Sequence, residues 1–178
     1  MKSILFIVFF LFSIFEVQAN RLILITKVVS EEVVKRKFND NQDPRLKPFK
    51  LEGSNACGIQ FVQLHVESVL NGVYDEQFID AHVILGEWCN QPFKPFQEYV
   101  VKLFDKDESI VSIHHTQLDG WEVFNVYSIE KLSNNERALT RDWHVNHFEH
   151  LKPSVVSEFN GKQVIKINEL KAWYTANK

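Results

Sequence analysis

Apolar and polar residues alternate along much of the chain, and this alternation predicts a series of strands. Val62, Leu64 and Val66 are separated by polar residues, which is the period of two expected for a strand with one solvent-exposed face. Ile59 and Phe61 are apolar in the opposite phase, which predicts a β-bulge near Phe61-Val62. The strands expected from such patterns are residues 21–29, 59–70, 79–85, 99–103, 109–115 and 121–129.

The pattern changes toward the C-terminus, where helices are expected. Ser133 and Glu136 have the spacing of a capping box, which predicts a helix that ends before Pro153. A short strand over 164–167 and a closing helix over 168–176 follow. Turns or loops are expected at residues 39–50, 71–72, 86–95 and 119–120. Strands followed by helices indicate a mainly β chain: an antiparallel barrel or sandwich with C-terminal helices packed on it.

The first nineteen residues have the pattern of a secretory signal peptide. Lys2 precedes an apolar run over 4–15, and small residues stand at the two positions read by signal peptidase in Val17-Gln18-Ala19. The run is shorter than the roughly 20 residues that a membrane-spanning helix needs. We therefore expect cleavage after Ala19, a single domain over 20–178 and no membrane span after cleavage. An uncleaved membrane anchor stays open as the alternative.

Charge and cysteine content narrow the compartment and the partners. The chain has a formal net charge of −3, and its basic residues are scattered, which argues against a nucleic-acid partner. Its two cysteines, Cys57 and Cys89, favour a disulfide in an oxidising compartment. Two buried reduced thiols are the alternative. The expected location is secreted or periplasmic.

Two stretches in the middle of the chain carry a family resemblance. The first is residues 61–70 with the Asn71-Gly72 turn, and the second is residues 89–101, where Phe93-Lys94-Pro95 precedes a strand. Together they resemble the netrin-like module, which is also found in tissue inhibitors of metalloproteinases. The resemblance covers residues 57–104 and implies an OB-like five-stranded antiparallel barrel with packed helices.

Two departures from that family limit what the resemblance implies. Phe96-Gln97 stands where Gly-Glu is usual in the family. The metalloproteinase inhibitors also begin with a cysteine whose amine and carbonyl bind the zinc of the target, and this chain is expected to begin at Asn20. The resemblance therefore implies the fold and not the inhibitory activity.

Three histidines are a candidate metal site. His144, His147 and His150 recur every third residue inside the expected helix, and neighbouring positions on one helix face can present imidazoles to zinc or copper. The alternative is a polar helix face or a core edge. The His114-His115 pair is too distant in sequence for its spacing to argue for a joint site.

Aromatic residues after residue 86 are the candidate binding patch: Trp88, Phe93 and Phe96. OB-like barrels bind ligands through loops and aromatic side chains, although the same residues can instead cap the core. The chain contains no nucleophile elbow, no His-Glu-x-x-His pair and no phosphate-binding glycine loop. We therefore expect an exported, non-catalytic binding module whose partner is a protein or a small ligand. A periplasmic metal-binding protein and an enzyme with an unrecognised carboxylate site stay open.

Overall fold

The computed structural model of the chain describes residues 21–37, 43–49, 51, 55–104, 121–140, 151 and 157–177. The expected signal peptide, the strand over 109–115 and the turn at 119–120 lie outside these residues. Within the described residues, no helix combines the length and the apolar character needed to cross a bilayer.

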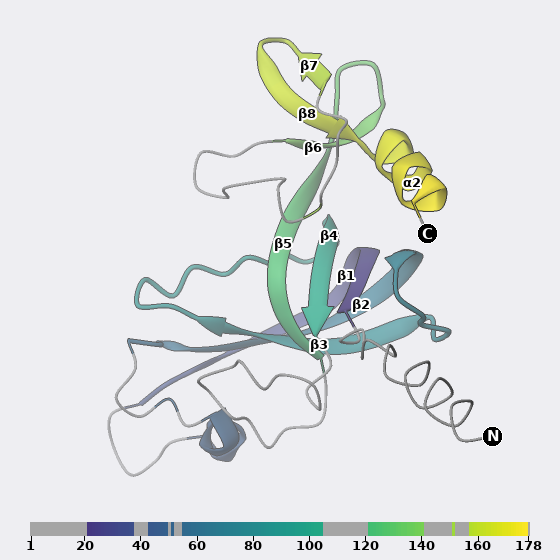
Figure 1. Cartoon of the computed structure of the whole chain (residues 1–178). Coiled ribbons are helices and arrows are strands. Elements are labelled where there is room, and N and C mark those ends of the chain that lie inside the picture. Colours follow the sequence, from purple (N-terminus) through teal and green to yellow (C-terminus); the bar gives the residue numbers. More distant parts are fainter. Residues whose placement is uncertain are drawn as a thin grey trace, which may run out of the picture.

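Five strands form a closed ring, which confirms the mainly β fold class (Figure 1). Neighbouring strands pair in the order β3-β2-β1-β4-β5, and each of these pairs is antiparallel. The ring closes through a short parallel pairing of β3 with β5, in which Ala81 lies opposite Trp121 and His82 opposite Glu122. The strands are β1 (Arg21–Lys35), β2 (Gly58–Asn71), β3 (Phe78–Leu85), β4 (Glu98–Phe104) and β5 (Trp121–Lys131).

Apolar side chains fill the interior of the ring. Alternate residues of each strand point inward, as Leu22 and Leu24 of β1 and Val101 and Leu103 of β4 do, and all four are buried. Phe93, from the loop between β3 and β4, belongs to the same cluster. This core accounts for the period-two pattern seen in the sequence.

The bulge expected near Phe61-Val62 is not in β2: the nearest register shift is in the pairing with β1, where Val29 is skipped opposite Gln63 and Leu64. Residues 58–65 of β2 pair with β3 without a register shift. The opposite phase of Ile59 arises because this end of β2 is buried on both faces. A 3-10 helix, η1 (Pro44–Phe49), covers the outer face, where Phe49 and Leu46 share a buried cluster with Ile59. The register shifts of β2 lie instead in its pairing with β1.

Beyond the ring, β5 continues into a second, smaller sheet (Figure 1). Its further strands are β6 (Arg137–Thr140), β8 (Lys162–Lys166) and β7 (Ser157–Phe159). The chain then forms α2 (Ile167–Ala176), which confirms the short strand and the closing helix expected at this end.

The prediction that a helix starts at Ser133 is wrong. Residues 133–136 form a turn between β5 and β6, closed by a 2.8 Å hydrogen bond from Leu132 N to Glu136 O. Asn135 has a left-handed φ of 64°, which a continuing α-helix does not allow. The Glu136 carboxylate binds Asn134 and Lys166 and not the start of a helix. Residues 141–150, with the three candidate histidines, lie outside the described residues.

The second sheet and α2 pack against the outer face of the ring. Ile167, Leu170 and Tyr174 of α2 share a buried cluster with ring residues including Ile25 and Tyr127. Burial raises the pKa of Tyr127 and of Tyr174 to about 12 in each case. Tyr174 donates a 2.8 Å hydrogen bond to the carbonyl of Leu151.

An ion-pair network ties these two parts together. Arg137 of β6 binds both carboxylate oxygens of Glu67 on β2, at 2.6 and 2.9 Å, and contacts Glu98 of β4 at 2.9 Å. Lys171 of α2 also reaches Glu67, at 3.2 Å. The hydrogen bonds from Arg137 hold the pKa of the Glu67 carboxyl below its usual range.

The network predicts an acid-sensitive contribution to stability. Because the folded state lowers the pKa of Glu67, this contribution is present above the ordinary glutamate pKa and is lost as the pH falls through the lower, folded value. We expect Glu67→Gln to lower the free energy of unfolding by about 0.5–1 kcal/mol at neutral pH, since the pair is partly exposed. Urea unfolding at neutral and acidic pH measures the difference.

The control for this prediction is Glu130→Gln, which changes an exposed carboxylate on β5. We expect this control to leave stability unchanged at both pH values. The difference between wild type and Glu67→Gln should shrink in acid. An equal difference at both pH values would contradict the role given to the network.

Candidate functional site

The loop over residues 86–97, called here the aromatic loop, joins β3 to β4 and carries the three candidate aromatic residues. Trp88 is 83% exposed and Phe96 is 75% exposed, whereas Phe93 is 1% exposed and lies in the ring core. Phe93 therefore caps the core, as the alternative interpretation supposed, and does not contribute to an exposed surface. A binding role for Trp88 and Phe96 stays a prediction.

The buried side chain of Gln60 fixes the middle of the aromatic loop. Its Oε1 accepts a 3.2 Å hydrogen bond from Phe93 N, and its Nε2 donates a 3.0 Å bond to Phe93 O. The same Nε2 donates to the Glu31 carboxylate at 2.8 Å. A fully buried amide with both its oxygen and its nitrogen bonded strongly specifies one position for Phe93.

The C-terminal part of the aromatic loop is held by Tyr99 and by β1. The Tyr99 hydroxyl accepts a 2.9 Å bond from Lys94 N and donates a 2.9 Å bond to Gln97 Oε1. Burial raises the pKa of Tyr99, so its hydroxyl stays a donor. The backbone of Val28 binds Phe96 N at 3.1 Å and Gln97 O at 2.9 Å.

A disulfide holds the N-terminal part of the aromatic loop. Cys57 and Cys89 are bonded, with their Cα atoms 5.6 Å apart, which confirms the expected pairing. Cys57 lies directly before β2, so the bond fastens the aromatic loop to the start of a ring strand. The disulfide, Gln60, Tyr99 and Val28 together restrain the aromatic loop along its length.

Each exposed aromatic residue of the aromatic loop is the third residue of a turn. Cys89 N donates to Gly86 O at 2.9 Å, which places Trp88 in the first turn, and Gln97 N donates to Lys94 O at 3.3 Å, which places Phe96 in the second. Phe96 has a φ of 62°. Proline followed by a residue with positive φ is the arrangement of a type II turn, in which glycine is preferred at the third position. A phenylalanine there costs about 1–2 kcal/mol.

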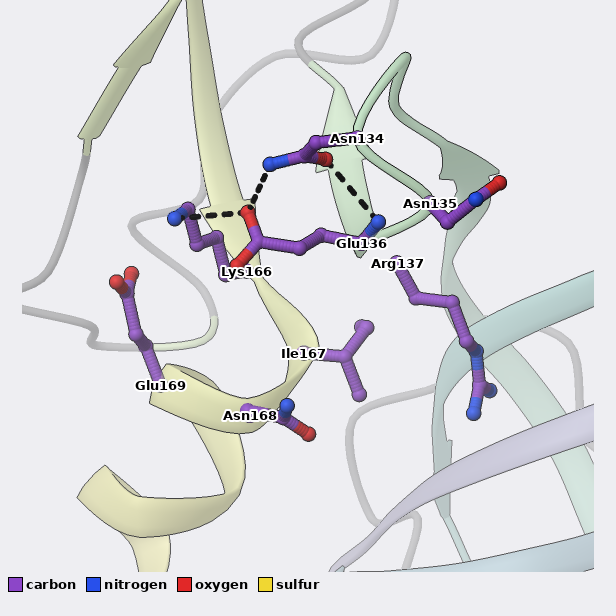
Figure 2. Close-up of a pocket in the computed structure, with 8 residues that line it drawn as sticks. All are labelled: Asn134, Asn135, Glu136, Arg137, Lys166, Ile167, Asn168 and Glu169. Carbon is purple, nitrogen blue, oxygen red and sulfur yellow. Dashed lines mark hydrogen bonds and ion pairs between the residues drawn. The ribbon is translucent and has the colours of Figure 1, made fainter.

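A polar pocket of about 470 Å³ lies between the β5–β6 turn and the start of α2 (Figure 2). Lys166 binds Glu136 at 2.8 Å, and Asn134 donates to the same carboxylate at 2.7 Å. These contacts lower the pKa of Glu136, and the bond to Glu136 raises that of Lys166. Its lining residues are Asn134, Asn135, Glu136, Arg137, Lys166, Ile167, Asn168 and Glu169.

Three of the four charged residues that line this pocket have ion-pair partners within the protein. Lys166 is the counter-ion of Glu136, and Figure 2 shows the Arg137 guanidinium directed away from both, consistent with its bonds to Glu67. The fourth, Glu169, lies in the first turn of α2, and its Oε2 is buried without a hydrogen-bond partner among the described residues. The sequence did not reveal this pocket, because its members come together only through the pairing of β6 with β8.

The structure does not test the predicted metal site. His144, His147 and His150 lie outside them, so zinc or copper binding there stays a prediction. Among the residues that the structure does describe, no three His, Cys, Asp or Glu side chains are grouped so that they could hold a metal ion.

No protein-family model, no curated protein and no solved structure matches this chain. The netrin-like resemblance of residues 57–104 therefore stays an expectation. The aromatic loop is then the candidate site on its own geometry: two exposed aromatic side chains on a restrained backbone.

The strain at Phe96 yields a stability prediction. Phe96→Gly should raise the free energy of unfolding by about 1 kcal/mol, because glycine adopts the left-handed conformation without the clash of a Cβ atom. Phe96→Ala is the matched control: it removes the ring but keeps the Cβ, and should show no such gain. Chemical denaturation of both variants measures the difference, and equal stabilities would contradict the strain.

Proposed function

We propose that this protein is an exported, non-catalytic binding module that makes contact through the aromatic loop. The observation that carries the proposal is the exposure of Trp88 and Phe96 on a backbone held by a disulfide and by buried hydrogen bonds. Large aromatic side chains dominate binding energy at many interfaces, and a rigid backbone lowers the entropy lost on binding.

Two further parts of the proposal rest on the sequence. Export is supported by the signal-peptide pattern of residues 1–19 and is compatible with the Cys57–Cys89 disulfide. A netrin-like module is supported by the motifs of residues 57–104, and the five-stranded ring is compatible with it. In this proposal the ring is a scaffold and the aromatic loop is the contact surface.

Site-specific photo-crosslinking tests this function. A photoreactive phenylalanine analogue is placed at Trp88, at Phe96 or at Val73, and the exported protein is irradiated in its native compartment. Val73 is the matched control, since it is as exposed as Trp88, at 83%, and lies in the connection between β2 and β3. We expect adducts, resolved by mass spectrometry, at positions 88 and 96 and not at 73. Adducts at 73 with none at 88 and 96 would refute the aromatic loop as the contact surface.

A further inference from the structure

We propose that the aromatic loop binds an anionic lipid surface, with Trp88 and Phe96 inserted among the lipid headgroups. This inference rests on the proposed function, since it names the partner of the same surface.

The size and shape of the surface favour lipid over protein. Trp88 and Phe96 project from two separate turns, and Phe93 between them is buried, so the aromatic loop presents projecting side chains and not a groove. Val29 is 40% exposed and follows Val28, whose carbonyl binds Phe96 N. A stable protein–protein interface uses about 20–30 residues on each side, whereas a few aromatic side chains suffice at a membrane interface.

The charges around Phe96 favour an anionic surface. Lys94 precedes it by two residues and Lys27 adjoins Val28, and both lysines are exposed. Of the nearby acids of β1, Glu32 is paired with Arg45, whereas Glu31 is half-buried, accepts a hydrogen bond from the neutral amide of Gln60 and keeps its charge. Within the aromatic loop, all of which the structure describes, Glu87 is the one acidic residue, and it adjoins Trp88. Lysines beside inserted aromatic rings match the anionic headgroups of lipids.

The backbone of the aromatic loop fits insertion as well. An indole ring suits the membrane interface, because its body is apolar and its N–H can bond to headgroups or water. Phe96 would relax out of its left-handed φ of 62° if the loop were mobile, and its bonds to Val28 prevent this. The protein thus holds the Phe96 ring in solvent at a cost in stability, which insertion into lipid explains.

Vesicle flotation of the full chain tests the inference. The vesicles are phosphatidylcholine alone or with about 30% phosphatidylserine, at low and high salt. We expect wild type to float with the anionic vesicles and to dissociate at high salt. The double variant Trp88→Ser/Phe96→Gly should lose about tenfold or more in its partition coefficient. Lys27→Gln/Lys94→Gln should lose binding to the anionic vesicles, and Val73→Ser should behave as wild type.

Misfolding does not confound this test. Phe96→Gly is expected to be more stable than wild type, so loss of flotation in the single Phe96→Gly variant reports the ring and not unfolding. Failure of wild type to bind anionic vesicles at low salt would overturn the inference, as would equal flotation of wild type and the double variant. If protein adducts at positions 88 and 96 persist in the crosslinking experiment while vesicle binding fails, the proposed function stands and the lipid surface falls.

Discussion

The pairing of β1 with β2 along one edge and with β4 along the other is the constraint on which the rest of the structure depends. Because β1 lies between two strands, its side chains point alternately into the ring and onto its outer face. Leu24 and Val28 therefore reach the ring core, Ile25 reaches the core beneath α2, and Val34 reaches the core covered by η1. One strand thus joins three apolar clusters, and its backbone at Val28 also fixes the aromatic loop.

The inward and outward positions of the strands were predicted best where one face of a strand is exposed to solvent. In such a strand, as around Leu64, the alternation of apolar and polar residues directly predicts which side chains point into the core and which point to solvent. The prediction was wrong where both faces are buried, at Ile59, because the covering segment is remote in sequence. The helix start predicted at Ser133 was also wrong. The capping-box pattern is local, whereas the pairing of β5 with β6 and the left-handed φ of Asn135 make this segment a turn.

The candidate site was predicted in outline for a similar reason. Three aromatic residues close together in sequence indicated a loop with exposed or capping rings, but nothing local decides which ring turns inward. That choice is made by Gln60, which lies 33 residues from Phe93 in sequence and bonds both its N and its O. The netrin-like motif has glycine after Lys-Pro, so Phe96 is a departure from it. The positive φ of Phe96 is the conformation that glycine adopts without strain, which explains why this departure matters.

The exposure of Trp88 and Phe96 is not a by-product of building the ring. Phe93 fills this end of the core, where Gln60 bonds to its backbone and its ring packs against that of Tyr99. A glycine at position 96 would form the same turn at lower energy, and a polar residue at 88 would leave the disulfide in place. Both aromatic side chains therefore reduce solubility, and one also reduces stability, with no gain in packing that the structure shows. Selection for the fold accounts for neither ring, whereas the proposed contact outside the protein would account for both.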